Sequence, residues 1–202
     1  FTVTDGQCVS PAAAVAITVL PNAKPTCVPD VAVFGCGTKF ANDTKTYLVS
    51  INEQDACVVL SAAASTDSDG DPLTYTWVID ATNSLAGPMV WTNCFELGCH
   101  TVDLIVADNK GASCSISLEV CVITPSEACE QLITLVENTT VDRANKRPLI
   151  ATLKAAQASF DRDSLTSGLG QLGAFQNKTS AQIGKSNPAE AQMFIQAAQS
   201  VI

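Results

Sequence analysis

The hydrophobic pattern changes its period at residue 124, and this change constrains the fold more than any other feature of the chain. Before it, short runs rich in β-branched residues are separated by turn sequences, which is typical of strands. The clearest of these runs are 31–34, 56–60, 73–79, 101–107 and 115–123. After it, apolar residues recur at helical spacing. The sequence therefore predicts segregated domains of the α+β class, with an antiparallel β-sandwich followed by a small four-helix bundle.

Capping residues divide the helical part into four segments. Thr124, Pro125 and Glu127 match a capping box with proline in the first turn. The expected N-caps of the later helices are Asn145, Asp163 and Asn187. The third helix contains three glycines, which we expect to allow close helix packing: Gly168, Gly170 and Gly173.

The net negative charge comes entirely from the β part of the chain. Its 13 acidic residues and 4 lysines in positions 1–125 account for the whole net charge of −9, while positions 126–202 are balanced. This excludes nucleic acid and anionic membrane surfaces as expected partners, because no basic stripe is present. No apolar run approaches the roughly 20 residues of a membrane-spanning helix. An acidic domain of this kind is suited to binding a hard cation.

Nine cysteines lie within the first 129 residues. They contain no C-x2-C spacing, and His100 is the only histidine, so a zinc ribbon is not expected. Disulfides in an oxidising compartment are the better interpretation, which predicts an extracellular or cell-surface protein. Since nine is an odd number, at least one thiol must be free or bonded to another chain.

Residues 57–123 resemble the PKD domain, an immunoglobulin-like module of extracellular proteins. The resemblance is carried by LSAAASTDSDGDPLTYTWVID at 60–80 and HTVDLIVADNKGASCSISLEV at 100–120. The sequence differs from the family at two places. After Trp77, VIDATNSLAG stands in place of the usual Trp-aspartate-phenylalanine-Gly-Asp-Gly run. Before the matching region, the segment from Cys27 to Asp55 is longer than the short first strand of the family. The resemblance implies an Ig-like sandwich.

Two further resemblances cover the ends of the chain. Residues 1–20 resemble the last two strands of an Ig-like or cadherin-like repeat. Residues 126–202 resemble the FIMAH helical module of secreted bacterial proteins, through RPLIATLKAAQASFDRDSLTSGLGQLGAFQNKTSAQI. The implied domains are a partial hairpin or donor strand at 1–21, a PKD-like sandwich at 22–124 and a FIMAH-like bundle at 125–202. None of these families is catalytic by itself.

The DSDGD turn is the candidate metal site. Ca²⁺ takes six to eight oxygen ligands and accepts carboxylates, and some PKD domains hold it between this turn, a late aspartate and the N-terminal linker. The resemblance implies the ligands Asn22, Asp67, Asp69, Asp71 and Asp108. The alternative is a solvated turn whose carboxylates accept hydrogen bonds from their own backbone.

Disulfide pairing is predicted only in part. We expect Cys94 to pair with Cys99, because four intervening residues close a loop easily. Cys27 and Cys114 form a second candidate pair, at the starts of neighbouring strands of the sandwich. The pairing of a remaining group stays open: Cys36, Cys57, Cys121 and Cys129. Cys8 is the candidate for the odd thiol or for a bond to another chain.

No catalytic constellation is expected. The serines have no plausible base, and His100 is interpreted as a structural residue at a strand start. Trp77 is expected in the core, whereas Trp91 is open to a role as a sugar-binding platform.

An apolar two-stranded hairpin at residues 1–20 is marginal alone in water. It is expected to be completed by the rest of its own domain, by the sandwich or by another subunit. The leading hypothesis is a non-catalytic extracellular structural or cell-adhesion module. It would be a filament or surface-protein subunit whose N-terminal strands pair with neighbouring copies or upstream Ig-like repeats. The alternative is a C-terminal accessory region of a secreted hydrolase, which binds a glycan or anchors the enzyme to a cell surface.

Overall fold

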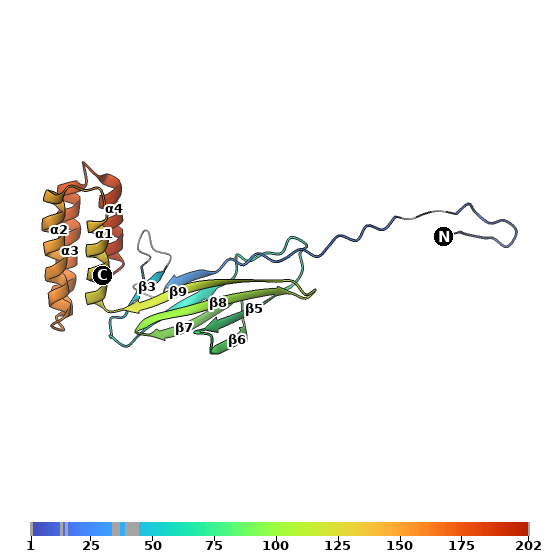
Figure 1. The fold of residues 1–202 in the computed structure, drawn as a ribbon, viewed down its shortest axis with the longest axis horizontal. Helices are drawn as coiled ribbons and strands as arrows, with labels where there is room; N and C mark the ends of the chain where they lie inside the picture. Colours follow the sequence, from blue (N-terminus) through green and yellow to red (C-terminus); the bar gives the residue numbers. More distant parts are fainter. Residues whose placement is uncertain (1, 13, 15, 34–36, 39–44, 202) are drawn as a thin grey trace.

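A computed structural model describes residues 2–12, 14, 16–33, 37–38 and 45–201. It contains a sandwich of two β-sheets, with a helical bundle at one end and an extended N-terminal arm that leaves from the other end (Figure 1). The fold class predicted from the sequence, a β-sandwich followed by four helices, is confirmed.

The sandwich is built from a three-stranded and a six-stranded sheet. The small sheet is antiparallel and has the order β1 (Asp30–Val33), β4 (Asp55–Ser61), β7 (Val90–Glu96). The large sheet has the order β2 (Gly37–Thr38), β3 (Thr46–Val49), β9 (Ser113–Ile123), β8 (Gly98–Asp108), β5 (Leu73–Ile79), β6 (Asn83–Gly87). The strands β3 and β9 run parallel, so this sheet is mixed and not purely antiparallel as expected.

The sandwich core follows from strand alternation. On β8 every second side chain from Val102 to Val106 is fully buried, and β4 buries Val58 and Leu60 from the facing sheet. Trp77 on β5 is also fully buried, as expected, and its indole N–H donates to the carbonyl of Pro88 at 3.4 Å.

The bundle contains α1 (Pro125–Glu137), α2 (Arg143–Phe160), α3 (Leu165–Ile183) and α4 (Pro188–Gln199). The predicted capping box at Thr124 and Glu127 is present. Two of the predicted N-caps are wrong, since Asp142 caps α2 and Ser164 precedes α3. The carboxylate of Asp142 accepts the amide hydrogens of Ala144 and Asn145, so α2 begins almost a turn earlier than expected.

The bundle is packed directly on the end of the large sheet. Only Thr124 separates β9 from α1. One buried cluster contains residues of both parts, from the sheet Tyr47, Val49, Cys121 and Ile123, and from the helices Leu132, Leu153, Phe175 and Phe194 among others. The sheet therefore continues into the bundle without a flexible linker.

The expected Cys94–Cys99 disulfide is wrong. Cys94 lies on β7 of the small sheet and Cys99 on β8 of the large sheet, so their side chains belong to different layers. Each is instead bonded to the residue directly opposite on a neighbouring strand, giving Cys57–Cys94 and Cys99–Cys121. A further disulfide is the candidate pair Cys27–Cys114, which is confirmed.

Cys129, expected among the disulfide cysteines, is a free thiol in the structure. Its side chain is buried in the core that the helices share with the large sheet, where Cys121 is already bonded to Cys99. Burial, together with the charges of Asp161 and Glu130, raises the pKa of this thiol to about 12. Cys8 is unpaired and exposed, in agreement with its assignment as the odd thiol. Cys36 lies outside the described residues.

The N-terminal arm forms less regular structure than the two strands expected. A turn at Asp5 and Gly6 is closed by a single bridge between Thr4 and Val9, and the carboxylate of Asp5 accepts the amide hydrogens of Gln7 and Cys8. Residues 16–20 are extended and exposed, without a ladder partner among the described residues. The arm reaches away from the sandwich (Figure 1), so the chain's own sandwich does not complete it.

Candidate cation site at the base of the arm

The acidic turn between Thr66 and Leu73 folds around its own first carboxylate. Asp67 Oδ1 accepts the amide hydrogens of Asp69 and Asp71, at 2.9 and 3.3 Å. Gly70 takes φ of 77°, which is a conformation that favours glycine. As a result, one carboxylate oxygen from each of the three aspartates lies within 4.8 Å of the others.

A further carboxylate, that of Asp108, stands at the end of β8, where the turn into β9 begins. Asp108 Oδ1 accepts the amide hydrogens of Lys110 and Ala112, at 2.8 and 2.9 Å. Its other oxygen accepts a hydrogen bond from the side-chain amide of Asn22 at 2.8 Å. Burial acts to raise the pKa of Asp108, but these hydrogen bonds outweigh it and hold the pKa below its usual value.

The base of the arm joins the two turns. The backbone N–H of Ala23 donates to Asp69 Oδ2 at 2.6 Å, one residue after Asn22 makes its bond to Asp108. The ammonium of Lys110 lies 2.8 Å from Asp71 Oδ1 and so links the turns a second time. The structure therefore brings Asp67, Asp69 and Asp71 into one carboxylate cluster, and the hydrogen bonds of Asn22 and Ala23 connect Asp108 to it. It adds Lys110, which the sequence analysis did not single out although it lies two residues after Asp108.

Two oxygens of this cluster are unsatisfied. Among the described residues, Asp67 Oδ2 and Asp71 Oδ2 are buried without a hydrogen-bond partner, and the side chain of Asp71 is only 9% exposed. Buried carboxylate oxygens without partners are costly, because their desolvation is not compensated. Several oxygens of high negative charge density around one point are the donor set that Ca²⁺ prefers. The chemistry of the cluster fits a hard divalent cation.

His100 contacts three residues of the sandwich: Asp80, Glu96 and Phe95. Its Nδ1 lies 2.9 Å from Asp80 Oδ2, its Nε2 lies 3.0 Å from the carbonyl oxygen of Glu96, and its ring packs at 5.1 Å from that of Phe95. Burial alone would lower the pKa of His100, but the hydrogen bonds to Asp80 and Glu96 and the charge of Asp80 raise it overall. The hydrogen bond between His100 and Asp80 also lowers the pKa of Asp80.

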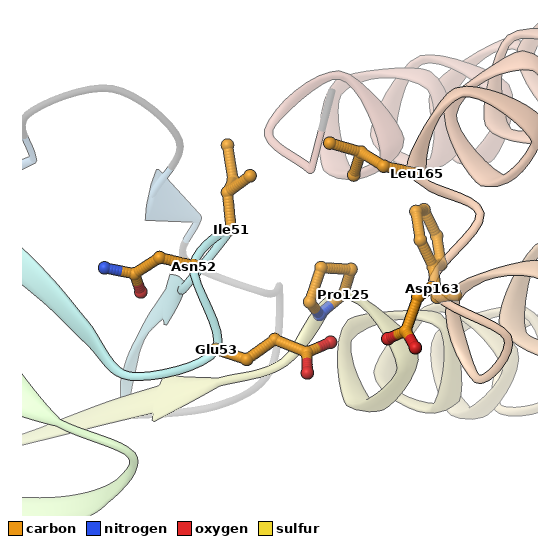
Figure 2. Close-up of a pocket in the computed structure, with 7 residues that line it drawn as sticks. Ile51, Asn52, Glu53, Pro125, Asp163 and Leu165 are labelled. Atoms are coloured by element: carbon orange, nitrogen blue, oxygen red, sulfur yellow. The ribbon is translucent and has the colours of Figure 1, made fainter.

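Trp91, the residue considered as a sugar platform, lies on β7 and packs partly against the sandwich core. A separate hollow of about 260 Å³ lies where the turn after β3 approaches the bundle. Figure 2 shows its apolar side chains, including Ile51, Pro125 and Leu165, with the carboxylates of Glu53 and Asp163 beside them. None of the residues named from the sequence as a metal, disulfide or sugar-binding candidate lines this hollow.

No described helix has both the length and the apolar character that crossing a membrane requires. Neither a protein-family model nor a curated protein matches the sequence.

Eight chains of known structure match this chain, and two of them are similar to about half of it. One contains the fibronectin(III)-like modules of Clostridium thermocellum CbhA, with 15% identity over 48% of this chain and 98% of that chain, at a TM-score of 0.29. The other is a nucleoside hydrolase-related hypothetical protein from Saccharophagus degradans associated with carbohydrate metabolism, with 22% identity over 51% of this chain and 26% of that chain, at a TM-score of 0.31.

Proposed function

We propose that the chain is a non-catalytic, extracellular structural module that pairs through its N-terminal arm with a neighbouring Ig-like unit. In this proposal the sandwich is a PKD-like module and the bundle a FIMAH-like module of a secreted or surface protein. The paired units build a filament or an adhesive surface layer.

The exposed arm carries this proposal. Ile17, Val19 and Leu20 are 82%, 86% and 77% exposed. Ile17 and Val19 alternate with the smaller Ala16 and Thr18 in an extended segment, and Leu20 follows Val19 directly. Burying each of these side chains would contribute roughly 1.5–3 kcal/mol. An extended apolar segment without a sheet partner is the form in which a chain adds a strand to another sheet.

The disulfides support an extracellular location. Three bonds between described residues hold the sandwich, and two of them staple directly opposed residues of neighbouring strands. Bonds of this kind form and persist in oxidising compartments. The third joins Cys27, at the foot of the arm, to Cys114 at the start of β9, so a pull on the arm is transmitted to the large sheet.

Calcium completes the proposal by fixing the arm. Asn22 and Ala23 hold the acidic cluster from the arm side. A Ca²⁺ ion bound by Asp67, Asp69, Asp71 and Asp108, with Asn22 beside it, would tie the base of the arm to both turns. It would supply the positive charge that the two unpartnered oxygens lack, and so restrict the direction in which the arm leaves the sandwich.

Sedimentation of the purified chain over a range of concentrations tests the proposal. We expect the wild-type chain to associate as its concentration rises, and the double variant Ile17→Asp/Val19→Asp to remain monomeric. Gln7→Asp, in the exposed turn of the arm, is the matched control and should associate like the wild type. A wild-type chain that is monomeric throughout, or a double variant that associates equally well, would contradict arm-mediated pairing.

A further inference from the structure

The large sheet has an open edge beside the core. β9 pairs with β8 along residues 113–122, but on its other side β3 pairs only with Val120–Ile123. Residues 113–119 therefore present one row of backbone donors and acceptors that no described strand pairs with. Natural sheets usually protect such an edge with charged residues or proline. Ser113–Leu118 contain neither, and the one charged residue of the edge is Glu119 at its end, which pairs with Lys45 at 2.7 Å.

The two faces of this edge differ in a regular way. Ser113, Ser115 and Ser117 are exposed on the outer face. Ile116 is opposite the fully buried Leu104 and so points toward the core, yet it is 39% exposed. Leu118, on the same face, is only partly buried. The core is thus incompletely covered along this edge.

The arm has the matching pattern. In residues 16–20 the larger side chains Ile17 and Val19 share one face of an extended segment, and the small residues Ala16 and Thr18 share the other face with Leu20 at its end. The segment carries no charge. Laid beside β9, it would place Ile17 and Val19 next to Ile116 and Leu118, and Ala16, Thr18 and Leu20 on the face of the serines.

We propose that residues 16–20 of one copy add as a strand to the edge at residues 113–119 of a second copy. This inference rests on the proposed function and names the acceptor that the arm requires. The added strand would satisfy the open backbone groups of β9 and cover the exposed side of Ile116. Since every copy carries both the segment and the edge, the pairing needs no other protein.

Photo-crosslinking identifies the acceptor directly. A chain with benzoylphenylalanine in place of Val19 is mixed with isotope-labelled wild-type chain, irradiated, and its cross-linked peptides are mapped by mass spectrometry. We expect mixed-isotope cross-links within residues 113–119. Cross-links to another surface of the labelled copy, or only within one chain, would overturn the inference.

A pair of surface variants separates this inference from the proposed function. Ile116→Lys should raise the dissociation constant of self-association at least about tenfold, since it places a charge where Ile17 and Val19 would pack. Thr92→Lys, at an exposed position on the small sheet, should leave it unchanged.

The two proposals fail in different ways. If residues 16–20 pair with some other surface, Ile116→Lys will associate like the wild type while Ile17→Asp/Val19→Asp does not. The arm then still mediates pairing, and the edge at 113–119 is excluded as its acceptor. If the double variant associates like the wild type, both the proposed function and this inference are overturned.

Discussion

At the scale of single residues, the carboxylates of the acidic turn lie beside the base of the arm, where the backbone of Ala23 donates to Asp69. The alternation of Asp67, Asp69 and Asp71 around a glycine is a local pattern, and Asp108 lies in an equally recognisable turn. The resemblance to PKD domains linked these turns to Asn22, which is 86 residues from Asp108 in the chain and hydrogen-bonded to it in the structure. The ammonium of Lys110 was not predicted, because a lysine in a turn has no sequence signal that distinguishes a surface charge from a partner of Asp71.

Calcium is expected to stabilise the sandwich through this cluster. Saturating Ca²⁺ should raise Tm, since a ligand at a hundred times its Kd adds about 2.7 kcal/mol to the free energy of unfolding. Asp71→Asn should largely remove the effect, because one of the unpartnered carboxylate oxygens is lost. Asp30→Asn, an exposed acid on β1, is the control and should respond like the wild type. Calorimetry in Ca²⁺ and in EGTA checks this, and equal Tm values in the two buffers would refute the cation site.

A second expectation at this scale concerns pH. Because the pKa of His100 is raised in the folded chain, its protonated form stabilises the fold. That contribution is complete below about pH 6.5, the ordinary histidine pKa, and is lost as the pH rises through the folded value. Urea unfolding from about pH 6 upward should show the wild type losing stability while His100→Gln changes less. Parallel pH profiles for the two chains would show that the contact with Asp80 contributes nothing.

At the scale of elements, the sequence predicted what depends on local pattern and missed what depends on pairing. The predicted limits of β5 and the predicted start of α1 agree with the structure, because strand alternation and the capping box depend only on residues close together in the sequence. The parallel pairing of β3 with β9 and the separation of Cys94 and Cys99 into different sheets depend on contacts distant in sequence. No turn or spacing encodes them.

The glycines of α3 illustrate the same limit. The sequence predicts close packing at all three, yet only at Gly168 would a Cβ atom overlap another side chain, the ring of Phe160 on α2. Gly168→Ala should therefore destabilise the bundle by roughly 1–3 kcal/mol through overpacking. At Gly170 and Gly173 an added Cβ atom would meet no other atom within 4 Å. Gly170→Ala and Gly173→Ala should therefore stabilise the bundle by up to about 1 kcal/mol each, because alanine favours the helix over glycine. Urea denaturation measures all three, and a stabilising Gly168→Ala would refute the close contact between α2 and α3.

At the scale of the whole molecule, the two ends of the sandwich differ in what they leave exposed. One end is closed by the bundle, whose core includes Cys121 and Ile123 of the large sheet. At the other end the arm extends away from the acidic cluster (Figure 1), and the apolar side chains of the arm are exposed to solvent. A sequence of local patterns can predict that such an arm needs a partner, but the open edge of β9 became visible only when the strand order was known.

Hydrogen exchange of the arm tests the central claim most directly. Amides of residues 17–20 are measured by mass spectrometry at increasing protein concentration, with β8 as an internal reference for the folded sandwich. Arm-mediated strand pairing predicts that exchange in this segment slows as concentration rises, and that Ile17→Asp/Val19→Asp abolishes the protection. Exchange at the rate of an unstructured chain at every concentration, while β8 remains protected, would contradict it.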